Sequence, residues 1–166
     1  ALEVLREDVW EIPQKAIVKG LARVRKNTGF RGRMDILQRK PTILLDTAHN
    51  EAGIERVFAQ VKEQSYGQLH VVLGMVSDKQ HNTLLSLFPK DAHYYFVKPN
   101  VPRGYNELTL RLKAEAFDLY GNNYRSVAVG LETAISRAQE DDFIFVGGST
   151  FEVAEALQYW KSLEEV

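Results

Sequence analysis

The sequence has 166 residues, enough for one domain with a hydrophobic core. With 45% hydrophobic and 26% charged residues, its composition is that of an ordinary soluble protein, and the absence of cysteine excludes a disulfide framework and a thiolate metal site. We find no signal peptide and no apolar run long enough to span a bilayer, so a cytoplasmic protein without membrane contact is expected.

The net charge of −1 is spread unevenly along the chain. The first 40 residues hold ten Lys/Arg and five Asp/Glu, whereas the remaining 126 hold eleven and seventeen. A basic segment can face phosphate groups, although a solvated helix face explains it more simply. Because aromatic residues are not interleaved with these basic residues, nucleic-acid binding is not expected.

Residues 1–27 are expected to be helical, with two apolar sets that Pro13 separates. A turn-rich hinge follows at 27–32. Residues 33–38 alternate in the manner of a strand, and the turn after them leads at once into the apolar run 42–45. Two strands so close in sequence are most simply an antiparallel pair.

From there the sequence alternates between apolar runs and amphipathic segments. We expect strands at 69–75, 92–97, 126–129 and 143–146, and helices at 51–63, 79–88, 107–120, 131–139 and 151–163. Repeated strand–helix pairs with near-continuous apolar strands predict an α/β domain of three layers, Rossmann-like, with helices on both faces of the sheet. The sheet is expected to have about six strands, mostly parallel, with one antiparallel strand.

The stretch 41–50, PTILLDTAHN, carries the densest polar cluster. Asp46 stands where the strand should end, and Asn50 can cap the next helix. Ligands of open α/β sheets bind beyond the carboxyl ends of the strands. There Asp46 can accept hydrogen bonds from ribose hydroxyls or hold a cation, and His49 can bind a carboxylate or shuttle a proton. Alternatively, Asp46 only caps the turn and His49 is a surface histidine.

The turn at 147–150, Gly-Gly-Ser-Thr, follows the last strand and begins the last helix. Glycines let the backbone approach a ligand, and free N–H groups at a helix start favour an anion. The hydroxyls of Ser149 and Thr150 can add donors, or one of them is simply the N-cap. Neither GxxxxGK[ST] nor GxGxxG occurs in the sequence, which excludes a P-loop and a dinucleotide fingerprint.

Arginines stand in two further loops, Arg31 and Arg33 at the hinge and Arg103 in the two-proline loop 98–104. The guanidinium fork suits phosphate, although solvated loop residues are an equal or better explanation. Asp78 is expected to cap a helix. The scattered histidines His70, His81 and His93 have no metal-ligand spacing, so no metal site is expected.

Five motifs in order resemble the C-terminal domain of folylpolyglutamate and dihydrofolate synthases, which belong to the Mur ligase superfamily. They are Gly32-Arg33, the DTAHN box at 46–50, GMVSDK at 74–79, Pro102-Arg103, and Gly148-Ser149 followed by an aromatic residue and Val-Ala-Glu. The resemblance covers about residues 17–160. It departs at Glu51 and Arg31, where the family usually or commonly has proline.

The resemblance implies an ATP-dependent amide ligation. ATP would phosphorylate a carboxylate of a folate or pteroate, and the amino group of L-glutamate would attack the acyl phosphate. By position, Arg33 would contact the ATP phosphates, Asp46 the nucleotide, and His49 and Ser149 the glutamate. Asn50 and Arg103 are secondary candidates, and no catalytic residue is certain within this chain.

The P-loop, the Mg²⁺ ligands and the folate pocket of that family lie in a larger N-terminal and central region. Residues 1–27 would then be a helical remnant of the central ATPase domain, and residues 28–166 the glutamate-binding C-terminal domain, inactive alone. Its partners would be ATP with Mg²⁺, the folate or pteroate, L-glutamate and that ATPase domain. Two alternatives are another Mur-type amide ligase and a stand-alone α/β ligand-binding module without catalysis.

Overall fold

The chain divides into two units between Arg31 and Gly32. The computed structural model describes residues 11–77 and 81–164, so part of the helical stretch expected at 1–27 lies outside the described residues. The first unit contains α2 (Gln14–Ala22) and α3 (Val24–Thr28), in which no residue is buried. The interpretation of this unit as part of a preceding domain stays a prediction.

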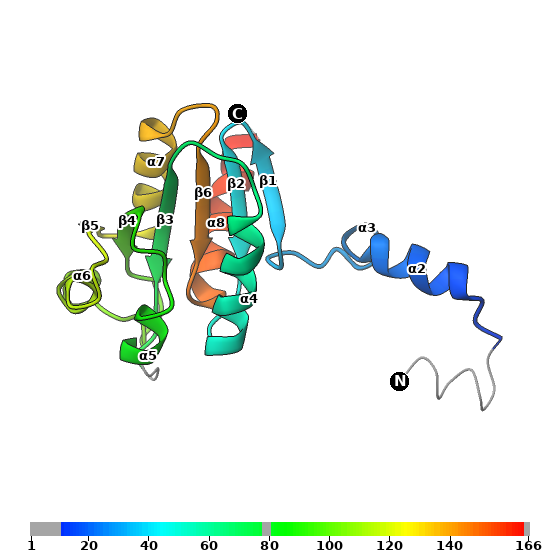
Figure 1. Cartoon of the computed structure of the whole chain (residues 1–166), viewed down its shortest axis with the longest axis horizontal. Coiled ribbons are helices and arrows are strands. Elements are labelled where there is room, and N and C mark those ends of the chain that lie inside the picture. The colour runs from blue at the N-terminus through cyan, green and yellow to red at the C-terminus, as the bar shows by residue number, and fades with distance from the viewer. Residues whose placement is uncertain (1–10, 78–80, 165–166) are drawn as a thin grey trace. The chain divides into compact units, whose positions relative to one another are not determined.

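The second unit is built on a six-stranded sheet with the strand order β1-β2-β6-β3-β4-β5 (Figure 1). The strands are β1 (Asp35–Arg39), β2 (Thr42–Asp46), β3 (Leu69–Gly74), β4 (Ala92–Val97), β5 (Gly121–Tyr124) and β6 (Phe143–Gly147). β1 pairs antiparallel with β2, and the other four pairings are parallel. The expected three-layer, mostly parallel α/β fold is therefore confirmed.

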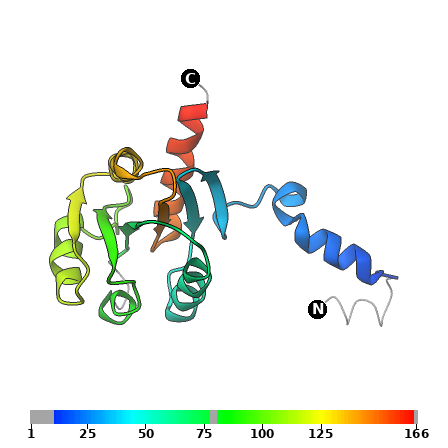
Figure 2. The same ribbon diagram turned by 45° about the horizontal axis from the view of Figure 1, so that its top comes forward.

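Helices cover both faces of this sheet (Figure 2). They are α4 (Glu51–Lys62), α5 (His81–Leu85) and α6 (Glu107–Glu115) on one face, and α7 (Val127–Arg137) and α8 (Thr150–Glu164) on the other. Alternate side chains of the buried strands enter the two cores, as Leu73 and Val72 of β3 do. Among the described helices, none is long and apolar enough to cross a membrane.

The expectation of a strand at 126–129 is wrong. That apolar run is the first turn of α7, where Ser126 is the N-cap and its Oγ accepts a hydrogen bond from the backbone N–H of Val129 at 3.3 Å. The fifth strand comes earlier, at Gly-Asn-Asn-Tyr 121–124, and lies at the sheet edge with its middle residues exposed. A polar edge strand buries too little side chain to need the apolar pattern that identifies a central strand.

A buried polar network holds the end of the sheet at which β3 and β6 begin. Asp142 accepts hydrogen bonds from the backbone N–H groups of Gln68 and Gln139, each at 2.7 Å, and lies 3.3 Å from Nε2 of His70. Nδ1 of His70 is 3.0 Å from the hydroxyl of Tyr95. Burial alone would raise the pKa of Asp142, but these hydrogen bonds outweigh it and lower that pKa below its usual range.

We expect Asp142→Ala to lower the free energy of unfolding by about 3 kcal/mol at neutral pH, because it leaves two backbone N–H groups and His70 without an acceptor. Denaturant titration measures the change, and Asp141→Ala, at an exposed neighbour, is the control with an effect within about 0.5 kcal/mol. Because the pKa of Asp142 is lowered, its stabilisation is present above the pKa of an unfolded aspartate and is lost as the pH falls through the folded value. An equal loss in both variants would contradict this role.

Candidate functional site

The strand order makes the connections change sides at the end of β6. The chain leaves β2 and β3 toward α4 and α5 on one face, whereas it leaves β6 toward α8 on the opposite face. Gly147 at the end of β6 lies between its register partners Asp46 on β2 and Leu73 on β3. Connections that diverge to opposite faces leave space at the carboxyl ends of the strands, where open α/β sheets bind ligands.

Asp46 connects the end of β2 to the first residues of the second unit, 32–34, which we call the entry segment. Its Oδ1 accepts a hydrogen bond from the backbone N–H of Ala48 at 2.7 Å, and its Oδ2 accepts one from that of Met34 at 2.8 Å. Nη1 of Arg33 lies 3.7 Å from Oδ1. The Asp46 side chain is buried and that of Arg33 is half exposed, so Asp46 fixes the position from which Arg33 reaches solvent.

Gly32 brings the same entry segment against α8. Its φ of +81° is unfavourable for residues with a side chain, and a Cβ built there would lie 2.8 Å from Cγ1 of Val153. The carbonyl of Gly32 also accepts a hydrogen bond from the N–H of Thr47 at 2.9 Å. A glycine at this position therefore lets the entry segment, the β2 turn and α8 come together.

A cavity of about 210 Å³ lies between the entry segment and α4. It is lined by Arg33, Met34, Asp46, Ala48, Gly53, Arg56, Val57 and Gln60. Sequence reasoning missed Arg56, because a single arginine on the exposed side of an amphipathic helix carries no distinguishing pattern. Two guanidinium groups at one cavity are suited to bind phosphate.

His49 follows the same turn with one ring nitrogen already bonded. Its Nδ1 lies 2.9 Å from the carbonyl oxygen of Thr47, so Nδ1 carries the proton and donates it. That bond leaves Nε2 of the half-buried ring for a ligand. Asn50 is the N-cap of α4, because its Oδ1 accepts a hydrogen bond from the N–H of Gly53 at 2.9 Å.

Ser149 begins the turn from β6 into α8. Its Oγ accepts a hydrogen bond from the backbone N–H of Glu152 at 3.1 Å, so Ser149 is the residue that caps the helix and its hydroxyl proton is left to donate. Gly148 before it has φ +125°, and a Cβ there would lie 2.6 Å from the carbonyl oxygen of Gly74. The absence of a side chain at Gly148 lets the turn pack against Gly74 at the end of β3.

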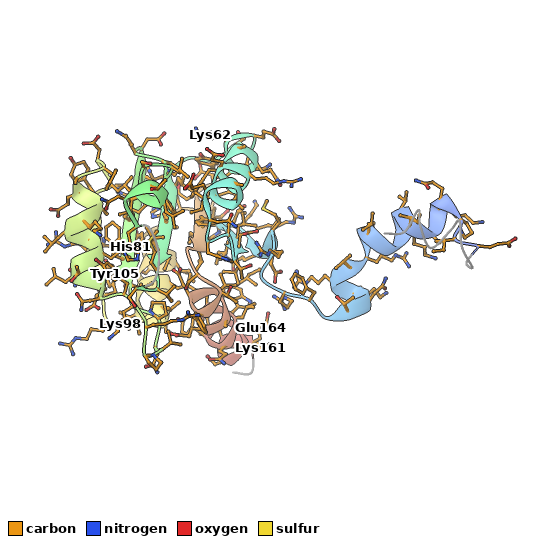
Figure 3. All side chains as sticks on the ribbon, turned by 90° about the horizontal axis from the view of Figure 1, so that it is seen from below. Lys62, His81, Lys98, Tyr105, Lys161 and Glu164 are labelled. Carbon is orange, nitrogen blue, oxygen red and sulfur yellow. The ribbon has the colours of Figure 1, made fainter. Side chains whose placement is uncertain are left out.

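The segment after β3 is fixed by a histidine. Nε2 of His81 donates to the carbonyl of Val76 at 2.8 Å, and its ring centroid lies 4.0 Å from that of Tyr105. Figure 3 labels these two neighbouring residues. Val76 in turn bridges to Gly104. His81 therefore has a structural role, whereas the helix cap expected at Asp78 lies outside the described residues.

Arg103 lies on the loop between β4 and α6. Its guanidinium lies over the ring of Phe151 at 5.1 Å, and its carbonyl accepts hydrogen bonds from the N–H and the hydroxyl of Ser77. Arg103 thus contacts the first turn of α8, where Ser149 is the cap. No group of three or more potential metal-ligating His, Asp or Glu side chains occurs among residues 11–77 and 81–164.

The arrangement brings Arg33, Asp46 and His49 together around the β2 turn, and register places Ser149 on the neighbouring strand end. It offers guanidinium groups, an imidazole, a hydroxyl and a helix N-terminus, all of which stabilise anions. Asp46 itself already accepts two backbone hydrogen bonds, so its main effect here is to position Arg33 and the turn.

We expect Asp46→Ala to lower the free energy of unfolding by about 3 kcal/mol, because the N–H groups of Met34 and Ala48 lose a charged acceptor. Glu51→Ala, at an exposed residue in the first turn of α4, is the control and should cost less than about 1 kcal/mol. Denaturant titrations of both variants measure the difference. Unchanged stability in Asp46→Ala would mean that other groups hold the entry segment.

A family model described as "Mur ligase, glutamate ligase domain" matches residues 32–150. Among curated proteins, the chain is 32% identical over 165 residues to a probable bifunctional folylpolyglutamate synthase/dihydropteroate synthase of Haloferax volcanii, covering 96% of this chain and 19% of that protein. It is 29% identical to the dihydrofolate synthase/folylpolyglutamate synthase of Escherichia coli, covering 95% of this chain and 36% of the relative.

Solved structures agree with these sequence matches. Escherichia coli FolC in complex with ADP, without folate substrate, superposes with a TM-score of 0.85 at 25% identity, covering 99% of this chain and 39% of FolC. The complex of FolC with DHPP and ADP gives a TM-score of 0.84. The chain thus spans well under half the length of the proteins that it matches.

Proposed function

Because the chain belongs to the family of Mur ligase glutamate ligase domains, we propose that it is the C-terminal domain of an ATP-dependent ligase that joins L-glutamate to a carboxylate of a folate or pteroate. The observation that carries the proposal is the set of anion-binding groups gathered at the ends of β2 and β6. Because the reaction consumes ATP, we also propose that the protein is cytoplasmic.

Arg33 is proposed to bind the phosphates of ATP, with Arg56 beside it at the same cavity. The guanidinium of Arg33 is half exposed, and the ion pair with Asp46 directs it. A contact of Asp46 with the nucleotide itself stays a prediction. Its two backbone hydrogen bonds support an indirect contribution, through the position of Arg33.

His49 and Ser149 are proposed to bind the glutamate. Nε2 of His49 and the hydroxyl proton of Ser149 are the groups that their own hydrogen bonds leave available. The N-terminus of α8 adds backbone N–H groups and a positive dipole end for a carboxylate. Asn50 and Arg103 are secondary candidates, the first as the α4 cap and the second through its place over Phe151.

The described residues include no carboxylate cluster suited to Mg²⁺, so the ligands of the metal and the folate pocket are proposed to lie in a partner ATPase domain of the same protein. When this domain closes on that partner, its residues would orient the amino group toward the activated carboxylate and exclude water. Such orientation lowers a barrier by about 7–11 kcal/mol.

The test is a ligase assay on the protein that carries this chain. With ATP, Mg²⁺ and a folate or pteroate, release of ADP should depend on added L-glutamate, because the amino acid is the nucleophile that completes the reaction. Replacing glutamate by other amino acids identifies a Mur-type ligase of different specificity. No release of ADP with any folate or pteroate and glutamate would contradict the proposal.

In the same protein, we expect Ser149→Ala to raise the apparent KM for glutamate about tenfold and to change that for ATP less than about twofold. The variant removes a hydroxyl donor worth about 1.5 kcal/mol to a charged ligand. Thr150→Ala, next to it on α8, is the control, because Thr150 is exposed and is not the N-cap. A rise confined to the KM for ATP would instead identify Ser149 as a nucleotide contact.

A further inference from the structure

The first turn of α8 contains a buried carboxyl group that has no hydrogen-bond partner among residues 11–77 and 81–164. Glu152 is 0% exposed, and neither of its carboxyl oxygens has a hydrogen-bond partner in the described part of the chain. The backbone N–H of Gly74 is near enough to favour the charged form of Glu152, but it makes no hydrogen bond of normal geometry. Buried polar groups are nearly always paired, so an unpaired carboxyl needs an explanation.

The surrounding backbone leaves room for this carboxyl. A Cβ at Gly74 would lie 3.1 Å from Cδ of Glu152, 3.1 Å from Cγ2 of Val97 and 3.2 Å from Cδ of Pro99. Glycine at the end of β3 therefore gives the carboxyl group its space. Pro99 belongs to the loop that follows β4, and the N–H of Asn100 in that loop donates to Oε1 of Glu155 at 2.6 Å.

Glu152 is part of the same turn as the proposed amino-acid site. Its backbone N–H donates to Oγ of Ser149, and Gly74, against which its carboxyl packs, is in turn in contact with Gly148. The spacing Ser149-x-x-Glu152 is that of a capping box, in which the carboxylate would return to the N–H of the cap. Here it turns instead toward β3, which is why the sequence pattern gives no sign of an unpaired acid.

Burial raises the pKa of Glu152 well above its usual range; the N–H of Gly74 lowers it, and the negative charge of Glu155 raises it further. Within the described residues, Glu155 is the ionisable group whose charge shifts the pKa of Glu152. The neighbours from β3, β4 and the loop after β4 are Gly74, Val97 and Pro99, none of which ionises. Before a ligand binds, burial and the negative charge of Glu155 therefore favour the neutral form of Glu152.

An amino acid carries an ammonium group as well as carboxylates. The groups proposed to bind glutamate, His49, Ser149 and the N-terminus of α8, all serve its carboxylates. Asp46 and Asp35 are also buried at this edge, but Asp46 has a backbone hydrogen bond on each oxygen and Asp35 accepts one from the N–H of Gly32. Glu152 is the acid at this edge for which the described structure gives neither carboxyl oxygen a hydrogen-bond partner.

We propose that Glu152 binds the ammonium group of the incoming amino acid once the loop that contains Pro99 and Asn100 moves aside. The proposal rests on the proposed function, because it is the amino-acid substrate that supplies the cation. On binding, the neutral acid releases its proton to solvent and the resulting carboxylate pairs with the ammonium group. Amino-acid affinity then increases with pH until the folded pKa of Glu152 is passed.

The test compares Glu152→Gln with the wild type in the full-length ligase, by the KM for glutamate between pH 6 and 9. Glutamine keeps the size of the side chain but cannot ionise. We expect the ratio of the variant's KM to that of the wild type to increase with pH and to reach tenfold or more, with the KM for ATP unchanged. Glu132→Gln, at an exposed residue of α7, is the control and should follow the wild type at every pH.

Calorimetry of glutamate binding in buffers of different ionisation enthalpy gives a second measurement, in which the wild type should release more protons than Glu152→Gln. Glu152→Met supports the same comparison if the glutamine variant is unstable, and we expect it to unfold at a higher temperature than the wild type because it removes an unpaired buried acid.

A constant KM ratio and equal proton release would overturn the proposal. If glutamate-dependent ADP release persists in that case, only the role of Glu152 fails; absence of that release in the wild type is the failure of the proposed function.

Discussion

The carboxylate of Asp46 connects the parts of the molecule on which the candidate site depends. It accepts backbone hydrogen bonds from Met34 on one side and Ala48 on the other, and Arg33 lies beside it. A carboxylate that receives N–H groups from two segments fixes both, because losing either bond would leave a buried charge partly unpaired. The entry segment, the β2 turn and the direction of Arg33 are thus set by one side chain.

Because β6 lies between β2 and β3, a second turn lies next to Asp46. This strand order places the glycine-rich turn next to Asp46 in register, while α8 leaves toward the face opposite α4. At Gly148 the backbone approaches the carbonyl oxygen of Gly74 at a distance that a Cβ would prevent, and at Gly32 a Cβ would meet the side chain of Val153. The polar edge is therefore a consequence of close backbone packing around a single inserted strand.

Asp46 and Glu152, two of the buried acids at this edge, differ in whether their oxygens have hydrogen-bond partners. Asp46 has a hydrogen bond on each oxygen and contributes to the fold, whereas Glu152 has none that the described residues provide. Another buried acid, Asp142, lies at the other end of the sheet and has hydrogen-bond partners on both oxygens. Because unpaired burial costs stability, the contrast separates an acid that supports the structure from one whose partner we propose to arrive with the substrate.

The sequence by itself determined the fold class and the strand-end positions of Asp46, His49 and Ser149, because apolar runs broken by polar clusters report which segments are buried and where they end. It also carried the ordered motifs that indicated the family. It misplaced the fifth strand, since Gly121–Tyr124 is a polar edge segment and the apolar run after it begins α7. Only the tertiary structure decided that β6 lies beside β2, that Arg56 joins Arg33 at one cavity, and that the carboxyl of Glu152 packs against Gly74 with no hydrogen-bond partner in the described part of the chain. These are contacts between residues far apart in the chain, and local periodicity reports burial but not which distant segment provides it.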